Sequence, residues 1–123
     1  MKILLVEDNP LCMEQVRDAI QSISDAVIVH VATTEKDACR WLAEHPDGWD
    51  LAIVDLFLKE GHGFNVLRCC SGRRSHQRAV VLSNYAIAPV HDYVRQAGAD
   101  AFFDKTHGLD GLLAFAMETE LAA

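Results

Sequence analysis

The chain has 123 residues and a mass of 13.6 kDa, and hydrophobic residues make up 50% of it and charged residues 24%. This length fits one compact domain, so we expect a single domain over residues 1–123 and exclude two full domains. A chain of this size buries roughly two-thirds of the surface that its unfolded form exposes, which allows a core without metals or disulfides.

The charge balance disfavours a general nucleic-acid binder. The chain has 11 Lys and Arg residues against 18 Asp and Glu residues, which gives a net charge of -7. Only Arg73, Arg74 and Arg78 form a basic cluster, and neutralising phosphates requires a larger one. The apolar runs are as short as strands, and Glu7 and Asp8 follow the first run at once. We therefore expect neither a signal peptide nor a membrane segment.

The four cysteines, Cys12, Cys39, Cys69 and Cys70, show no C-x-x-C spacing. Cys69 and Cys70 are adjacent, a spacing that suits neither a metal site nor a bridge. We therefore predict that all four are reduced thiols in a cytoplasmic protein.

Short apolar runs predict five β-strands, at residues 2–6, 27–31, 51–54, 79–82 and 101–103. The runs are continuous rather than alternating, so both faces of each strand must be covered. A parallel sheet between two layers of helices meets this requirement.

Helix signals lie between the predicted strands. Asn9 and Pro10 predict a helix over residues 9–24, and Thr34 with Asp37 predicts the capped start of a second helix. Three further helices are predicted, from about residue 63 to 72, around residues 90–97, and from about residue 109 almost to the C-terminus. The alternation of strands and helices predicts an α/β domain with one doubly wound sheet.

Polar residues follow the predicted strands, at the sheet edge where α/β proteins bind ligands. Glu7 and Asp8 follow the first strand, and Asp55 follows the third. Ser83 and Lys105 follow the fourth and fifth strands. Carboxylates so close together repel unless a cation lies between them. Because the ligands are oxygens, with no His or Cys among them, we predict a Mg²⁺ site.

A metal held beside an aspartate suits the transfer of a phosphoryl group. Asp55 is the best candidate to accept it as an acyl phosphate, because Asp55 ends a central strand while Glu7 and Asp8 hold the metal from a neighbouring strand. Lys105 would neutralise one phosphoryl oxygen, and the Ser83 hydroxyl would donate a hydrogen bond to another.

These residues, in this order, resemble the receiver domain of two-component response regulators over the whole chain. The match consists of the pair Glu7-Asp8, Asp55 in Val54-Asp55-Leu56, Ser83 in Val81-Leu82-Ser83-Asn84, and Lys105 in Phe103-Asp104-Lys105. The resemblance implies a flavodoxin-like, five-stranded parallel sheet in the order 2-1-3-4-5, with five helices.

The resemblance also implies a phosphoacceptor role for Asp55. A histidine kinase or a histidine phosphotransfer protein would supply the phosphoryl group. Mg²⁺ would be bound by Glu7, Asp8, Asp55 and the backbone carbonyl of Phe57. The only chemistry expected of the chain is self-catalysed phosphotransfer and autodephosphorylation, rather than enzymatic turnover of a small molecule.

A switch follows from the same resemblance. Ser83 would move toward the phosphate and Phe102 would turn inward. The surface of the fourth helix, fifth strand and fifth helix would then change its protein partners. Exposed residues expected on this output face are His91, Arg95, Gln96 and His107.

Thr106 and the loop after Asp55 depart from the family pattern, and Phe57 and Tyr85 stand at positions where the family varies. Thr106 replaces the proline that commonly follows the lysine, so we predict either a trans peptide bond or a strained site there. The loop after Asp55 lacks its usual proline, which predicts a more mobile loop. Phe57 and Tyr85 stand where this family tunes dephosphorylation, and we predict that their rings obstruct water and prolong the life of the phosphoprotein.

Alternatives from other classes stay open. The chain could bind partners without being phosphorylated, or it could be a receiver cut from a longer DNA-binding regulator rather than a stand-alone one. A flavodoxin-like protein that binds flavin or nucleotide is disfavoured by residues 6–10, because a phosphate cradle needs Gly, Ser or Thr rather than two acids. The oligomeric state is left open between a monomer and a homodimer.

Overall fold

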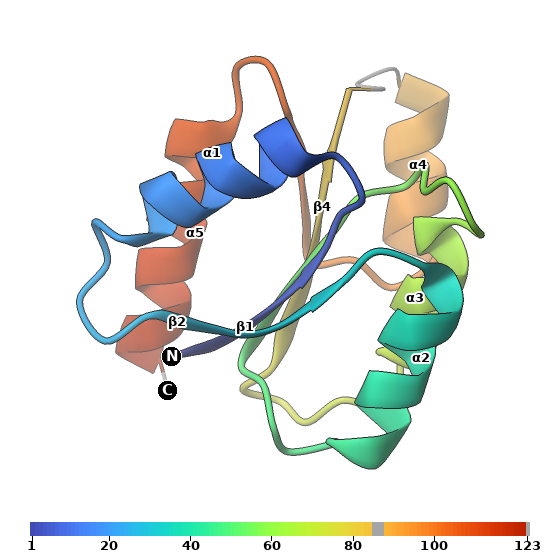
Figure 1. Cartoon of the computed structure of the whole chain (residues 1–123), viewed down its shortest axis with the longest axis horizontal. Coiled ribbons are helices and arrows are strands. Elements are labelled where there is room, and N and C mark those ends of the chain that lie inside the picture. The colour runs from blue at the N-terminus through green and yellow to red at the C-terminus, as the bar shows by residue number, and fades with distance from the viewer. Residues whose placement is uncertain (85–87, 123) are drawn as a thin grey trace.

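The computed structural model describes residues 1–84 and 88–122. Strands and helices alternate through the chain (Figure 1). The strands are β1 (Lys2–Val6), β2 (Val27–Ala32), β3 (Leu51–Val54), β4 (Arg78–Ser83) and β5 (Ala101–Asp104). The helices are α1 (Pro10–Ile20), α2 (Glu35–Glu44), α3 (Gly63–Cys69), α4 (Ala88–Gln96) and α5 (Leu109–Ala122).

The five strands form one parallel sheet in the order β2-β1-β3-β4-β5, which confirms the predicted fold class. Val6, the last residue of β1, pairs with Val54, the last residue of β3. The residues that follow these two strands therefore leave the sheet at the same level and on the same edge.

Helices cover both faces of the sheet, as its continuous apolar strands require. α1 and α5 lie on one face, and α2, α3 and α4 lie on the other (Figure 1). The alternating side chains of β1 divide between the two cores: Leu4 and Val6 face α2 and α3, whereas Ile3 and Leu5 face α1 and α5.

Both predicted helix caps are present. The Asn9 side chain accepts a hydrogen bond from the Cys12 amide at 3.1 Å, and the Thr34 hydroxyl accepts one from the Asp37 amide at 3.1 Å. α1 is shorter than predicted, because it ends at Ile20 rather than near residue 24. Ile23 remains buried beyond that end, so its apolar character belongs to the core and not to the helix.

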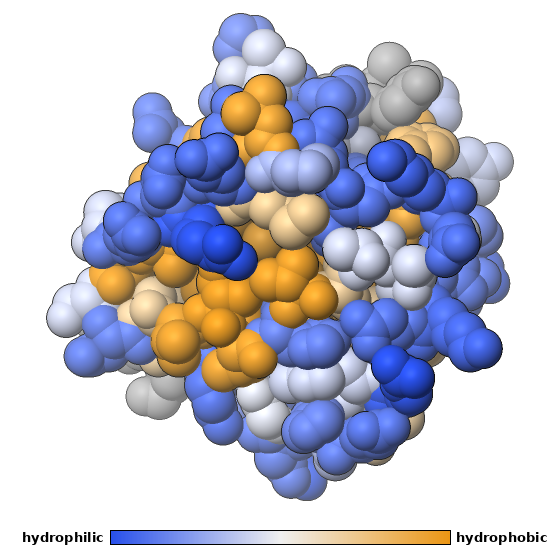
Figure 2. All heavy atoms as spheres, viewed as in Figure 1, coloured by the Kyte–Doolittle hydropathy of each residue, from blue (hydrophilic) through white to orange (hydrophobic). Residues whose placement is uncertain are grey.

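The outer strand β2 leaves apolar surface at the sheet edge. Figure 2 shows apolar side chains gathered on the part of the viewed face where α1, β1 and β2 lie. Leu11, Val27 and Val29 are among the exposed apolar residues of these elements. None of the described helices is long and apolar enough to cross a membrane.

Candidate functional site

Three carboxylates meet at the carboxyl edge of the sheet. Glu7 and Asp8 directly follow β1, and Asp55 directly follows β3. Glu7, Asp8 and Asp55 each offer an oxygen that lies within 4.8 Å of the other two. The pairing of β1 with β3 produces this cluster, because it fixes the two strand ends side by side.

Asp55 is buried in an electrostatically unfavourable position. Its backbone amide donates to the Val6 carbonyl at 2.9 Å, which continues the strand pairing to the site. Burial, followed by the negative charge of Glu7, raises the pKa of Asp55 from its ordinary value of 3.8 to about 6. The charge of Lys105 and hydrogen bonds from Lys105 and the Phe57 amide oppose this rise. An added cation would therefore stabilise the ionised site.

Lys105 supplies one positive charge within the cluster. Its ammonium nitrogen lies 2.8 Å from Glu7 Oε2 and 3.3 Å from Asp55 Oδ2. Burial lowers the pKa of Lys105, but the hydrogen bond to Glu7 and the charges of Asp55 and Glu7 outweigh burial and raise the pKa above its ordinary value. Lys105 is therefore a permanent cation at neutral pH.

The lysine reaches this position through a trans peptide bond. The described residues contain no cis peptide bond, so the Lys105–Thr106 bond is trans, one of the two outcomes predicted. The Lys105 amide donates to the Ser83 carbonyl at 3.0 Å and extends the pairing of β4 with β5. The Thr106 amide donates to Asp104 Oδ1 at 2.7 Å, which fixes the turn without a proline.

The acidic pair is held by backbone amides. Glu7 Oε1 accepts from the Asn9 amide at 3.0 Å, and Asp8 Oδ2 accepts from the Lys59 amide at 2.5 Å. The Cys12 thiol also hydrogen-bonds Glu7, and burial followed by the Glu7 charge raises the pKa of that thiol to about 11. The Cys12 contact was not predicted, although its place on the buried face of α1 was.

A hollow of about 200 Å³ opens beside the carboxylates. Its lining contains every predicted metal and phosphoryl-transfer residue, namely Glu7, Asp8, Asp55, Phe57, Ser83 and Lys105, together with Asn9 and Asn84. Ser83 is buried at the end of β4. The Phe57 side chain is 50% exposed at the mouth of the site. Tyr85, the other predicted tuning residue, lies outside the described residues.

The loop after Asp55 is fastened to α2 by Glu35. Glu35 Oε1 accepts from the His62 amide at 3.0 Å, and Glu35 Oε2 accepts from the Asn65 side chain at 3.2 Å. Gly61 has a φ of +87°, and a Cβ there would lie 2.4 Å from the Glu35 Cβ. These hydrogen bonds hold the loop after Asp55 to α2. The absence of the usual proline predicts a more mobile loop, and that mobility stays a prediction. This role of Glu35 was not predicted, because the sequence marks it only as an acid in the first turn of a helix.

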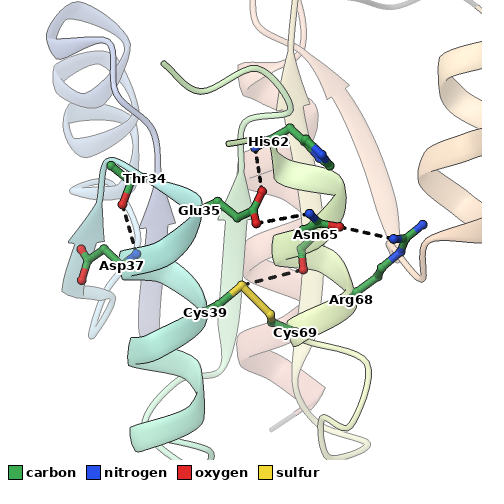
Figure 3. The surroundings of a disulfide bond; sticks show 8 residues. All are labelled: Thr34, Glu35, Asp37, Cys39, His62, Asn65, Arg68 and Cys69. Atoms are coloured by element: carbon green, nitrogen blue, oxygen red, sulfur yellow. Dashed lines mark hydrogen bonds between the residues drawn. A yellow bond between two sulfur atoms is a disulfide. The ribbon is translucent and has the colours of Figure 1, made fainter. Parts of the chain in front are cut away.

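The prediction of four reduced thiols is wrong for Cys39 and Cys69. Cys39 of α2 and Cys69 of α3 form a disulfide rather than two reduced thiols (Figure 3). Their Cα atoms lie 5.7 Å apart, within the range that a disulfide spans. The packing of α2 against α3 joins residues 30 positions apart, and that proximity has no signature in the cysteine spacing. Cys12 and Cys70 are buried free thiols.

The carboxylate cluster fits a hard divalent cation. Its donors are oxygens from adjacent strand ends, and burial, followed by the charge of Glu7, raises the pKa of Asp55, so that an added cation would favour the ionised carboxylate. Oxygen donors of this kind suit Mg²⁺ or Mn²⁺ better than Zn²⁺. Glu7, Asp8 and Asp55 are the residues that would hold such an ion.

Comparison with known proteins identifies the family. The sequence profile of the response regulator receiver domain matches residues 3–116, which is nearly the whole chain. The chain belongs to the response regulator receiver family. The comparison of this chain with curated proteins found no match.

Solved structures share the fold of this receiver domain. A LuxR-family two-component response regulator from Aurantimonas sp. SI85-9A1 is 24% identical with a TM-score of 0.82, and the match covers 98% of this chain and 84% of that one. The receiver domain of the NarL regulator from Mycobacterium tuberculosis is 20% identical with a TM-score of 0.80, covering 95% and 93% of the two chains. The Mn²⁺-bound form of the response regulator Rcp1 is 20% identical with a TM-score of 0.77, covering 97% and 91%.

Phe102 connects the receiver sheet to α4. It lies on β5, half-buried, and packs against the core on the side of α2, α3 and α4. Its ring centroid is 4.1 Å from that of His91 on α4. A change in the Phe102 rotamer would therefore alter a direct contact with α4. The predicted inward turn of this ring stays a prediction.

Proposed function

We propose that this receiver domain is a phosphorylation-controlled switch that accepts a phosphoryl group on Asp55 from a histidine kinase or histidine phosphotransfer protein. The observation that carries the proposal is the meeting of Glu7, Asp8, Asp55 and Lys105 around one hollow. Family membership supports the same role, because receiver domains transmit signals through proteins.

The proposed transfer begins with an ionised Asp55. A carboxyl with a pKa of about 6 is mostly deprotonated at pH 7 to 8. One Asp55 oxygen would attack phosphorus while the bond from phosphorus to the donor's imidazole nitrogen breaks. The electron pair of that bond stays with the imidazole, and the phosphoryl group becomes an acyl phosphate on Asp55. A bound Mg²⁺ would supply positive charge to the phosphoryl oxygens.

The chain's own residues would stabilise the transferred group. The Lys105 ammonium is already 3.3 Å from Asp55 and would neutralise a phosphoryl oxygen. The Ser83 hydroxyl lines the same hollow and would donate a hydrogen bond to another oxygen. The chain would catalyse only its own phosphorylation and dephosphorylation.

The proposed output lies on the α4-β5-α5 surface. Ser83 ends β4 and lies opposite Asp104 of β5 in the sheet, whereas Phe102 contacts His91 of α4. Adding a phosphoryl group at Asp55 would draw Ser83 toward it and release Phe102 to turn inward. A downstream protein, or a second copy of the chain, would bind the changed surface in the cytoplasm.

Intact-mass measurement after treatment with acetyl phosphate and Mg²⁺ tests the proposal. The wild-type protein should gain one phosphoryl group, and chelating the metal should prevent the gain. Asp55→Asn should gain none, whereas Asp18→Asn, an exposed substitution on α1, should behave as wild type. Equal labelling of Asp55→Asn and wild type would overturn the assignment, and no labelling of the wild type would support a module that works without phosphorylation.

A further inference from the structure

Two cross-links join α2 to α3. The first is the hydrogen bond between Glu35 and Asn65, and the second is the disulfide between Cys39 and Cys69. Glu35 and Cys39 are four residues apart on α2, and Asn65 and Cys69 are four residues apart on α3. Residues four apart lie on one face of a helix. Figure 3 shows Glu35 directed toward Asn65, and Cys39 joined to Cys69 about one turn further along each helix.

The first cross-link continues directly to the loop that follows Asp55. Glu35 accepts hydrogen bonds from the Asn65 side chain and from the His62 amide. His62 in turn forms an isolated β-bridge with Phe57, two residues after Asp55. The spacing of α2 and α3 therefore bears on the backbone beside the proposed phosphoacceptor.

The second cross-link has the features of an exchangeable thiol pair. Cys69 is exposed and Cys39 is half-buried, whereas Cys12 and Cys70 are buried with pKa values raised by burial to about 11 and about 12. A hollow of about 230 Å³ adjoins Cys69 and is also lined by Arg73. Cys69 is therefore the exposed end of the disulfide, from which a small thiol would approach.

A partner for the reduced state is already in place. The Cys39 sulfur lies 3.9 Å from the Asn65 carbonyl oxygen. A disulfide sulfur carries no proton, but a reduced Cys39 thiol could donate to this oxygen. Disulfides in cytoplasmic proteins are usually transient or redox-sensing rather than structural.

We infer that Cys39 and Cys69 form a reversible redox site that exchanges with a small-molecule thiol–disulfide couple of the glutathione class. Together, the Glu35 hydrogen bonds and this disulfide form a clamp between α2 and α3. When the cysteines are oxidised, the clamp restrains the loop after Asp55 more tightly. In oxidation, one cysteine thiolate attacks the small disulfide, forms a mixed disulfide and releases one small thiolate. The second cysteine thiolate then attacks the mixed disulfide and releases the other small thiolate. The two cysteine protons end on the two released thiols, and reduction reverses these steps.

The redox exchange can be measured without phosphorylation. The protein is equilibrated at a series of ratios of glutathione to glutathione disulfide, quenched in acid, and alkylated after denaturation. Intact-mass spectrometry then counts the alkylated thiols. We expect two of the four thiols to be lost together as the disulfide form increases. Cys70→Ser should keep this transition, whereas Cys39→Ser and Cys69→Ser should each abolish it. A pair that stays oxidised, or stays reduced, across the whole series would overturn the inference.

The effect on the loop is tested on the wild-type chain in its two redox forms. Hydrogen exchange should slow in the oxidised form by a larger factor for amides of residues 59–65 than for the control segment 16–20 in α1, where only the gain in global stability acts. Equal exchange in residues 59–65, or slowing there by no more than in the control segment, would overturn the coupling. Any consequence for phosphoryl acceptance rests on the proposed function, but both measurements here stand even if Asp55 is never phosphorylated.

Discussion

The Nζ atom of Lys105 lies 3.3 Å from Oδ2 of Asp55, although Lys105 follows the edge strand β5 and Asp55 follows the central strand β3. The lysine side chain thus passes the end of the intervening strand β4 to reach the acid. Because Glu7 also contacts Lys105, one ammonium group offsets two buried carboxylates from neighbouring strands. The site is consequently sensitive to the removal of either charge.

Replacing Asp55 with asparagine should stabilise the metal-free protein at pH 7.5. A carboxyl whose folded pKa exceeds its ordinary value of 3.8 favours the folded state below about pH 4, and this contribution is lost as the pH rises through the folded value of about 6. The gain in the free energy of unfolding should be roughly 1 to 3 kcal/mol at pH 7.5 and close to zero at pH 4. Urea denaturation at both pH values measures it. A gain of the same size at pH 4 would contradict the electrostatic explanation.

Replacing Lys105 with methionine should destabilise the protein, because it leaves Glu7 and Asp55 without their shared cation. Removing one partner of a buried ion pair costs several kcal/mol, and here we expect a loss of about 2 to 4 kcal/mol in metal-free buffer. Mg²⁺ should recover part of the loss. Lys36→Met, an exposed substitution on α2, is the matched control and should change stability little. Equal urea midpoints for the two variants would show that Lys105 does not offset these charges.

Replacing Phe57 with asparagine, or Tyr85 with alanine, should shorten the life of the phosphoprotein. The Phe57 side chain lines the mouth of the site and is half exposed, so its removal would open a path for attacking water. A tenfold faster decay corresponds to a barrier lowered by about 1.4 kcal/mol, and we expect an effect of about that size. Decay in Mg²⁺ buffer can be followed by intact mass. Tyr93→Ala removes another exposed aromatic ring, on α4, and should leave the rate unchanged; unchanged decay in both test variants would argue against steric protection.

Reducing the Cys39–Cys69 disulfide should lower the free energy of unfolding. The bond joins residues 30 positions apart, and closing a loop of this size stabilises by about 3 to 4 kcal/mol through its effect on the unfolded chain. Urea denaturation with and without reductant measures the difference. A Cys39→Ser, Cys69→Ser double variant should be insensitive to reductant. A wild-type midpoint that does not respond to reductant would contradict the prediction.

Much of the fold follows from the apolar runs of the sequence. Runs without a polar face require a sheet covered on both sides, and the residues after β1 and β3 are polar at the edge where a parallel sheet binds ligands. The apolar spacing also predicted an α1 that is too long. Ile23 keeps the helical spacing and is buried, although the helix ends at Ile20.

The apolar pattern of the sequence does not predict which residues of two helices make contact. The clamp formed by Glu35 and the Cys39–Cys69 disulfide depends on how α2 packs against α3. Both helices were predicted, but periodicity specifies which face of a helix is buried and not which residues of two helices meet. The tight approach of Gly61 to Glu35 was hidden for the same reason.

Chemical trapping of the acyl phosphate tests directly whether Asp55 carries the phosphoryl group. After labelling with acetyl phosphate and Mg²⁺, borohydride reduction converts a phosphorylated aspartate to homoserine, and peptide mass spectrometry locates the converted residue. Conversion at Asp55 alone is the predicted result, whereas conversion at Asp8 or another acid, with Asp55 unmodified, would contradict the account.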